Sequence, residues 1–150
     1  MTTPTDIDRK APVMAHHQID IAAPLERVWE LHTNVGQWPA WNAEVSAATL
    51  DGPFVPGNSF TWTSYDFTVT STIYDVEDRA RTLWGGAALG IMGTHEWLFE
   101  RTAQGVRVTT TESFAGDPVE ADAAGMQAIL DSSLTAWLTR MKTRAESASA

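Results

Sequence analysis

The feature that most constrains the fold is a run of about 70 residues, from Asn42 to residue 115, in which apolar and polar side chains alternate. Turn signals such as Pro56-Gly57 and Gln104-Gly105 interrupt the run at short intervals. Alternation indicates strands with one buried face, and short turns between them indicate antiparallel hairpins. The run therefore predicts strands near 43–50, 58–65, 67–76, 81–86, 94–101 and 106–115. A seventh strand is predicted at 16–21, within HHQIDI.

A long helix is expected after the last strand. Asp117 as N-cap, Pro118 at the first helical position and Glu120 resemble a capping box. Apolar residues then recur every three or four positions, at Met126, Ile129, Leu130, Leu134, Trp137, Leu138 and Met141. A stripe of this kind on a helix of about 25 residues, roughly 38 Å long, must be buried, and only the sheet is large enough to cover it. The fold class is therefore α+β.

The first 42 residues hold the remaining predicted elements. Residues 1–14 are polar, contain two prolines and have no apolar period, so they are expected to form a mobile tail before a single domain at 15–146. Leu25, Val28, Trp29 and His32 lie at helical spacing after Pro24. A second short helix is expected to hold Trp38 and Trp41, near a cavity mouth.

The charge balance excludes several partners. The formal net charge is −9, with 19 acidic and 10 basic residues and no basic patch, so neither nucleic acid nor an anionic membrane is an expected partner. No apolar run approaches the roughly 20 residues that span a bilayer, so no membrane insertion is expected. The sequence contains no cysteine and begins without a secretory pattern, which gives a cytoplasmic location by default.

Seven tryptophans are more than a chain of 150 residues needs for its core. Tryptophan is large and carries an N–H group, so it suits a pocket wall or an interface. Strand alternation places His95, Trp97 and Phe99 on one face, and it places Glu112 on the same face as Thr110. The predicted lining of a ligand pocket comprises Trp41, Phe60, Trp62, Trp84, His95, Trp97, Thr110, Glu112, Met126, Leu130 and Trp137.

Five short segments, in order along the chain, resemble the START-like superfamily, and within it the polyketide cyclase/dehydrase group of SRPBCC proteins. They are IDIAAPLERVWEL, NVGQWPAWN, DGPFVPGNSFTW, GTHEWLFE and GVRVTTTESFAG. The resemblance covers residues 16–145, although Asn34 stands where many relatives carry Asp. It implies a helix-grip fold, in which a seven-stranded antiparallel sheet wraps around the long helix and leaves a cavity between them. Members of this superfamily include cyclases, lipid and hormone carriers and chaperone cofactors, so the function must come from the site.

His95 and Glu112 are the candidate catalytic residues. Two ionisable groups on an apolar concave face have shifted pKa values, as general acid/base chemistry requires. Such a pair could remove a proton next to a carbonyl, and a tryptophan N–H or Thr110 could stabilise the enolate. The structural alternative is that Glu112 pairs with a nearby base or a water, and that His95 is a satisfied wall histidine.

Two further motifs carry less information. The glycine-rich segment 85–93 is either a mobile lid or an ordinary hairpin, and it lacks the helix, Lys and Ser/Thr of a phosphate loop. His16 and His17 point to opposite faces of a strand, and His32 has no partner at ligand spacing. Neither a metal site nor a cofactor is predicted.

Three functions remain open. The first is binding of a small hydrophobic molecule, aromatic or polycyclic, or a lipid, by tryptophan stacking with polar anchors at His95 and Glu112. The second is a polyketide cyclase or dehydratase that uses the same two residues. The third is a protein-interaction module of the chaperone-cofactor kind, which would need an exposed apolar patch. The sequence is compatible with a monomer or a homodimer.

Overall fold

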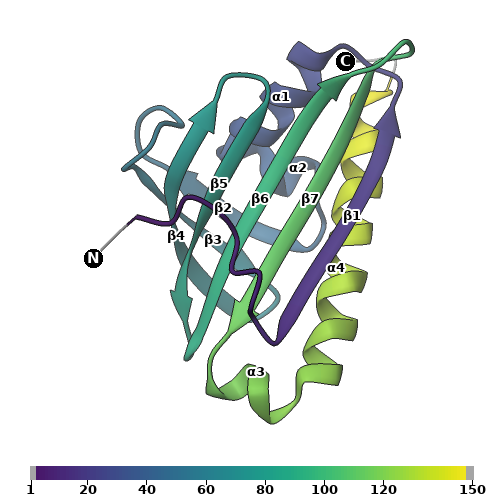
Figure 1. The fold of residues 1–150 in the computed structure, drawn as a ribbon. Helices are drawn as coiled ribbons and strands as arrows, with labels where there is room; N and C mark the ends of the chain where they lie inside the picture. The colour runs from purple at the N-terminus through teal and green to yellow at the C-terminus, as the bar shows by residue number, and fades with distance from the viewer. Residues whose placement is uncertain (1–2, 148–150) are drawn as a thin grey trace.

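The computed structural model describes residues 3–147, and it has the predicted helix-grip architecture (Figure 1). The strands are β1 (Val13–Ile21), β2 (Val45–Leu50), β3 (Ser59–Ser64), β4 (Phe67–Glu77), β5 (Arg81–Ala88), β6 (Ile91–Arg101) and β7 (Val106–Ala115). The helices are α1 (Leu25–Thr33), the 3-10 turn η1 (Val35–Gln37), α2 (Trp38–Trp41), α3 (Asp117–Ala121) and α4 (Ala123–Ala145). Every predicted strand is found, with ends that differ by at most three residues.

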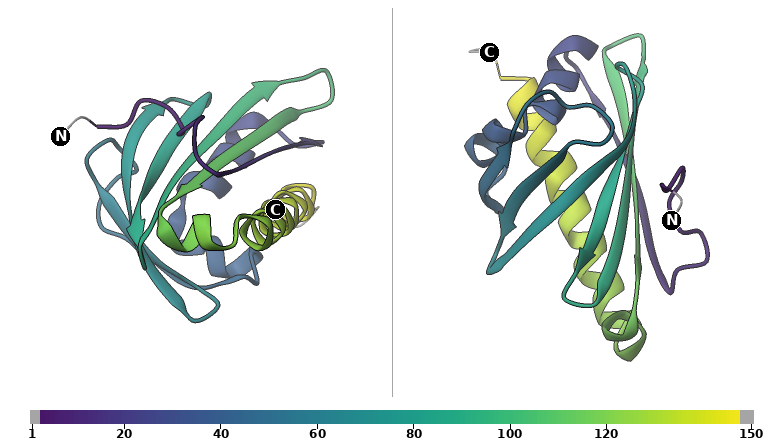
Figure 2. Two further views of the ribbon diagram at one scale, coloured as in Figure 1. Left: turned by 60° about the horizontal axis from the view of Figure 1, so that its bottom comes forward. Right: turned by 90° about the vertical axis from the view of Figure 1, so that its left-hand side faces the viewer.

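The seven strands form one antiparallel sheet in the order β1-β7-β6-β5-β4-β3-β2. Six of the strands follow one another as hairpins, as the closely spaced turns predict, and β1 joins the sheet beside β7. The sheet curves around α4, which lies in its concave side (Figure 2). α1 and α2 lie at one end of the molecule and α3 at the other (Figure 1).

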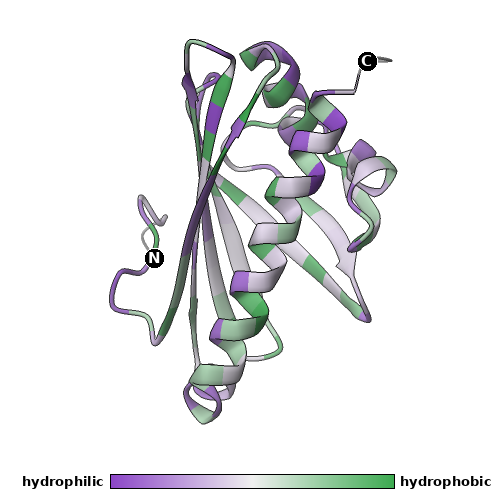
Figure 3. Ribbon diagram, turned by 90° about the vertical axis from the view of Figure 1, so that its right-hand side faces the viewer, coloured by the Kyte–Doolittle hydropathy of each residue, from purple (hydrophilic) through white to green (hydrophobic). Residues whose placement is uncertain are grey.

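Two apolar clusters fill the space between the sheet and α4. The larger cluster lies toward α1 and α2 and contains Trp38, Trp84, Trp97 and Trp137. The smaller one lies toward α3 and is built around Val13, Val119, Leu130 and Leu134, with Phe114 packed against it. Apolar segments recur along α4 where it faces the sheet (Figure 3). No helix among residues 3–147 is both long and apolar enough to cross a membrane.

The N-terminal segment contacts the convex face of the sheet. Ile7 is 4% exposed, and the backbone N–H of Asp8 donates to Ser113 Oγ at 3.0 Å. β1 begins at Val13, before the predicted boundary, because Val13 and Ala15 continue its buried face. The described part of the predicted mobile tail is thus packed against the sheet. Residues 1 and 2 of that tail lie outside the described residues.

The predicted C-terminal helix is divided in two. Gly116, not Asp117, occupies the N-cap position of α3, and no side chain caps that helix, so the predicted capping box is wrong. The chain leaves helical geometry at Asp122, whose side chain accepts a hydrogen bond from the backbone N–H of Gly125 and starts α4. Ile129 is 63% exposed and does not belong to the buried stripe, because the helix face turns away from the sheet at that position.

The glycine-rich segment 85–93 is the end of a hairpin and not a long loop. β5 continues to Ala88 and β6 starts at Ile91, so only Leu89 and Gly90 form the turn, both with positive φ. Gly85 is required by space, because a Cβ atom there would lie against the carbonyl oxygen of Gly93 on the paired strand. The segment is therefore a hairpin with a two-residue turn, and a role as a mobile lid stays a prediction.

Candidate functional site

His95 on β6 and Glu112 on β7 are direct partners in the sheet register, and both side chains lie on its concave side. His95 Nδ1 and Glu112 Oε1 are 3.5 Å apart. The His95 side chain is 2% exposed and that of Glu112 is 15% exposed. The alternation of buried positions on two paired strands thus brings the two candidate catalytic residues into contact.

Burial makes this pair neutral near pH 7. Burial lowers the pKa of His95 well below its usual range, and the nearby His32 adds to the decrease. Burial also raises the pKa of Glu112 to about 8, and the charge of Glu44 adds to the rise. A neutral imidazole therefore faces a protonated carboxyl group. At 3.5 Å the two atoms are in contact, although the distance exceeds that of a well-formed O–H···N hydrogen bond.

Thr110 contacts the other side of the His95 ring. Its Oγ1 lies 2.6 Å from His95 Nε2, and the same hydroxyl donates to the backbone carbonyl oxygen of Glu96 at 3.2 Å. Thr110 is fully buried. His95 is therefore held at both ring nitrogens, by Thr110 on one side and by Glu112 on the other.

Three tryptophans surround His95. The ring centroids of Trp84, Trp97 and Trp137 lie 4.8, 5.0 and 6.0 Å from that of His95. Each of these indole N–H groups is buried and has no hydrogen-bond partner among residues 3–147. Buried donors are nearly always paired in folded proteins, so three unpaired ones in one place need an explanation.

Two other tryptophans of the same cluster have paired N–H groups, whereas Trp41, which packs against the cluster, also has a buried N–H without a partner among residues 3–147. Trp38, predicted to lie near a cavity mouth, is instead fully buried, and its N–H donates to the backbone carbonyl of His32 at 3.0 Å. The Trp62 N–H donates to Ser71 Oγ at 3.1 Å. A tryptophan N–H in this cluster can thus be paired within the chain, and the three unpaired donors beside His95 are those that face one another around a single polar side chain.

Two polar residues that the sequence did not single out also lie in this region. His32 is fully buried, and its Nε2 lies 2.8 Å from Thr82 Oγ1. Burial lowers its pKa to about 3. Its position on the apolar stripe of α1 is the signal that could have found it. Glu44 accepts a hydrogen bond from Ser133 Oγ at 2.6 Å, and its side chain is 7% exposed. No sequence period marks Glu44.

The other predicted lining residues separate into two groups. Phe60, Trp41 and Trp62 belong to or pack against the larger cluster, whereas Met126 and Leu130 belong to the smaller one. Thr110 and Glu112 lie between the two clusters along β7, with Val108 on one side and Phe114 on the other. The candidate site is thus a polar layer between two apolar clusters.

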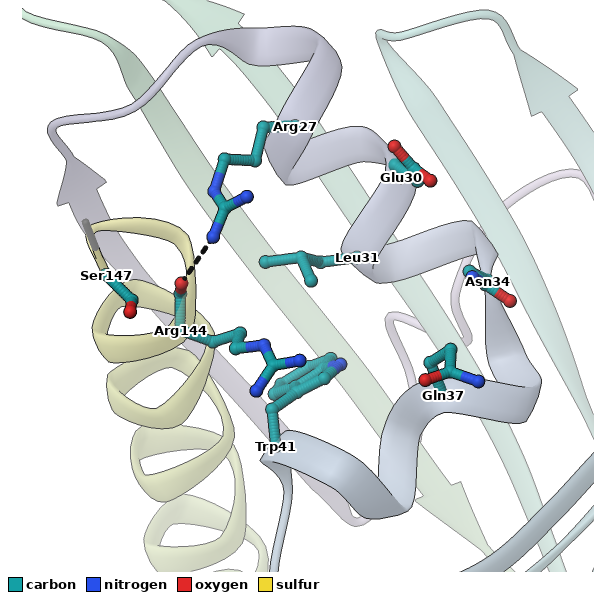
Figure 4. Close-up of a pocket in the computed structure, with 8 residues that line it drawn as sticks. All are labelled: Arg27, Glu30, Leu31, Asn34, Gln37, Trp41, Arg144 and Ser147. Carbon is teal, nitrogen blue, oxygen red and sulfur yellow. Dashed lines mark hydrogen bonds between the residues drawn. The ribbon is translucent and has the colours of Figure 1, made fainter. Parts of the chain in front are cut away.

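Two surface pockets lie elsewhere, beside α1. One, of about 310 Å³, lies between α1, α2 and α4 and includes Trp41 and Arg144 (Figure 4). Arg27 borders it and donates to the carbonyl oxygens of Ala145 and Arg144 at the end of α4, at 2.7 and 2.9 Å. The second, of about 390 Å³, lies between η1 and the segment around Pro53. Of the predicted ligand-binding residues, only Trp41 lines either pocket. Within the described part of the chain, no group of His, Asp and Glu side chains could hold a metal ion.

Comparison with known proteins identifies the family of the chain and shows that its fold occurs in solved structures. A family model described as "Polyketide cyclase / dehydrase and lipid transport" matches residues 13–146. No curated protein matches the chain.

Solved structures share the fold at low sequence identity. A hypothetical protein of Helicobacter pylori superposes with a TM-score of 0.80 at 18% identity, covering 97% of this chain and 99% of that one. A START superfamily protein of Mycobacterium smegmatis gives 0.76 at 10% identity, covering 89% and 97%. The di-domain ARO/CYC protein BexL of the BE-7585A biosynthetic pathway gives 0.70 at 18% identity, covering 89% of this chain and 50% of that one. At these identities the likeness concerns the fold.

Proposed function

The chain belongs to the polyketide cyclase/dehydrase and lipid transport family, and we propose that it binds a small hydrophobic ligand, aromatic or polycyclic, between α4 and the concave face of the sheet. The observation that carries this proposal is the set of three buried, unpaired indole N–H groups around His95. A bound molecule would give these donors the partners that the chain itself does not supply.

The chemistry of the site specifies the ligand further. The indole groups of Trp84, Trp97 and Trp137 can only donate, and Glu112, with its pKa raised to about 8, carries no charge near pH 7. No cationic side chain contacts Glu112 among residues 3–147. The ligand that fits is therefore a flat apolar molecule that carries hydrogen-bond acceptors such as carbonyl groups.

Binding requires the aromatic side chains to separate. Trp137 and Trp97 have ring centroids 5.5 Å apart, and Trp38 and Trp137 are 5.3 Å apart. Rings at these separations are in contact, so an arriving ligand replaces ring-to-ring contacts with ring-to-ligand contacts of similar kind. In the open arrangement the rings have separated. A ligand that binds this arrangement more tightly than the closed one shifts the protein toward it.

The first experiment is native mass spectrometry of the purified protein, followed by titrations of tryptophan fluorescence with an aromatic polyketide, a flavonoid, a sterol and a fatty acid. A saturable change at micromolar affinity or better with one class is expected. No saturable change with any class, together with no co-purified ligand, would overturn the proposal.

A matched pair of probes tests the acceptor. Fluorenone and fluorene share one ring skeleton, and only fluorenone carries a carbonyl group. Fluorenone is expected to bind about five- to tenfold more tightly, the value of one or two neutral hydrogen bonds. Trp97→Phe removes one unpaired N–H and should reduce this preference. Trp38→Phe, which removes a paired N–H, is the control and should leave the preference unchanged.

The contact between His95 and Glu112 favours a second candidate function, the cyclisation or dehydration of a carbonyl-containing ligand. A carboxyl group with a pKa of about 8 is close to the pH at which general acid/base catalysis is most effective. In that case His95→Ala or Glu112→Gln would reduce turnover by about 100-fold or more while the Kd changes only a few-fold. Equal losses of turnover and affinity would leave binding as the function.

A further inference from the structure

We infer that Thr110 is a positioning residue, whose hydroxyl group holds the neutral imidazole of His95 in the Nε2–H tautomer and thereby presents the bare Nδ1 to Glu112. The functional meaning of this inference rests on the proposed site. The tautomer itself is a property of the ligand-free protein.

The argument begins at the Thr110 hydroxyl, which has a single hydrogen. The backbone carbonyl oxygen of Glu96, 3.2 Å from Thr110 Oγ1, can only accept a hydrogen bond. We assign the hydroxyl hydrogen to that carbonyl, which leaves Oγ1 to meet His95 Nε2, at 2.6 Å, with a lone pair. The contact at 2.6 Å is then a hydrogen bond only if Nε2 carries the hydrogen.

The other side of the ring is compatible with this assignment. His95 is buried and neutral, so it has one N–H group, and a hydrogen on Nε2 leaves Nδ1 as an acceptor. Glu112 is protonated near pH 7, and its Oε1 lies 3.5 Å from Nδ1. The hydrogen bonds consequently run in one direction, from His95 through Thr110 to the Glu96 carbonyl, and the bare Nδ1 faces the protonated Glu112.

His32 and Thr82 form a matched pair without this constraint. His32 Nε2 lies 2.8 Å from Thr82 Oγ1, but within residues 3–147 the Thr82 hydroxyl makes no second hydrogen bond. His32 Nδ1 is buried and has no partner in the same part of the chain. Nothing in this pair directs the threonine hydrogen, so the two buried histidine–threonine contacts differ in this respect. A third contact, between His16 Nδ1 and Thr111 Oγ1 at 2.7 Å, is only partly buried.

The tautomer matters because only one nitrogen of His95 faces the acid. With the hydrogen on Nε2, Nδ1 accepts from Glu112 and keeps the carboxyl O–H in place beside the three unpaired indoles. With the hydrogen on Nδ1, the ring would donate toward Glu112, and the carboxyl group would turn its O–H elsewhere. Thr110, which lies on the far side of the ring, thus determines whether the Glu112 O–H is directed to His95 or is free for a ligand.

Nitrogen NMR of ligand-free protein labelled with ¹⁵N-histidine measures the tautomer at pH 7, with His95 assigned by its loss in His95→Gln. The wild type is expected to show a protonated Nε2 and an unprotonated Nδ1 at His95. Thr110→Val should change the tautomer ratio toward Nδ1–H severalfold, and Thr110→Ser should restore the wild-type ratio. Thr82→Val should leave His95 unchanged.

A protonated Nδ1 in the wild type would overturn the inference, and so would a Thr110→Val ratio equal to that of the wild type. If Thr110→Val does not fold, the wild-type tautomer and Thr110→Ser still decide the question. These spectra need no ligand, so failure of the proposed binding function leaves the result standing, and the reverse also holds.

Discussion

Glu96 on the convex side of the sheet and Glu112 on its concave side lie on neighbouring strands and have similarly small exposed fractions, 12% and 15%. Glu96 accepts a hydrogen bond from Arg81 at 2.8 Å. Arg81 also donates to Asp75 at 2.9 Å and to the carbonyl of Thr5 at 3.0 Å. Among residues 3–147 Glu112 has no cationic partner, and its one polar contact is with His95. Glu96 and Glu112 are thus buried to nearly the same extent, but only Glu96 is paired with a cation among residues 3–147.

The difference in charge pairing distinguishes a structural network on the convex side from a candidate ligand site on the concave side. On the convex side Glu96 is paired with Arg81, which also binds Asp75 and the Thr5 carbonyl and so fixes the N-terminal segment to the sheet. On the concave side burial shifts the pKa values of Glu112 and His95, and no cation among residues 3–147 compensates at Glu112. Incomplete buried groups with shifted pKa values are where a ligand's atoms are expected.

The largest expected effect concerns the pH dependence of Glu112. The pKa is about 8 in the folded protein and 4.5 in the reference state, so between these values the folded protein keeps a proton that the unfolded chain has lost. The stabilisation is complete below pH 4.5 and is lost as the pH rises through 8, by up to about 1.4 kcal/mol per pH unit and roughly 5 kcal/mol in all.

Glu112→Gln does not titrate and should show no such loss. Urea denaturation of both proteins from pH 4.5 to 8.5 measures the difference between them, in which titrations common to both cancel. Parallel stability curves would mean that Glu112 ionises as an ordinary carboxyl group, and the contrast between the two sides would disappear.

Arg81→Met tests the convex side. It leaves Glu96 buried without a cation, and the free energy of unfolding should fall by about 3 kcal/mol, the lower end of the range for broken buried pairs, because both side chains keep some exposure. Urea denaturation at pH 7 gives the value. Arg107→Met is the control, since its pair with Asp20 is exposed and its loss should produce no resolved change. Equal effects of the two variants would contradict the structural role.

Ile7→Ala tests whether the N-terminal segment belongs to the convex side in solution. Loss of a side chain that is 4% exposed should reduce stability by about 2 kcal/mol. Ile129→Ala, at a position that is 63% exposed, is the matched control and should have almost no effect. If Ile7→Ala is as neutral as its control, residues 3–12 are the mobile tail that the composition predicts.

The smallest expected effect compares two fully buried tryptophans. Trp38→Phe removes a donor that pairs with the His32 carbonyl, whereas Trp97→Phe removes a donor that has no partner among residues 3–147. Both substitutions remove the same atoms, so the difference isolates the hydrogen bond, and Trp38→Phe should cost about 1 kcal/mol more. Thermal or urea unfolding resolves this difference. A greater loss in Trp97→Phe would mean that its N–H is paired after all.

The strands and their buried faces could be predicted because the signal is local. A strand buries alternate residues, so the sequence already contains the parity that places His95 and Glu112 on one side. The family resemblance and the long α4 rest on the same kind of local pattern, and both are confirmed.

Features that depend on contacts between distant residues could not be predicted. Ile7 is buried because the convex side offers Arg81 and Ser113 as anchors, and nothing within residues 3–12 shows this. The start of α4 was misplaced because two capping signals compete, and the side chain of Asp122 is the one that caps. Trp38 lies in the core through its contact with His32 and not through any period.

The pairing of β1 with β7 has a consequence for the order of folding. Val13 pairs with Phe114, about 100 positions later, and Ala15 pairs with Glu112 itself. Contacts so far apart in sequence form late, because the loop between them must close first. During synthesis the hairpins from β2 to β6 can assemble while their concave side still lacks β7 and α4. A ribosome-bound chain consequently exposes its aromatic face until the last third of the protein has emerged.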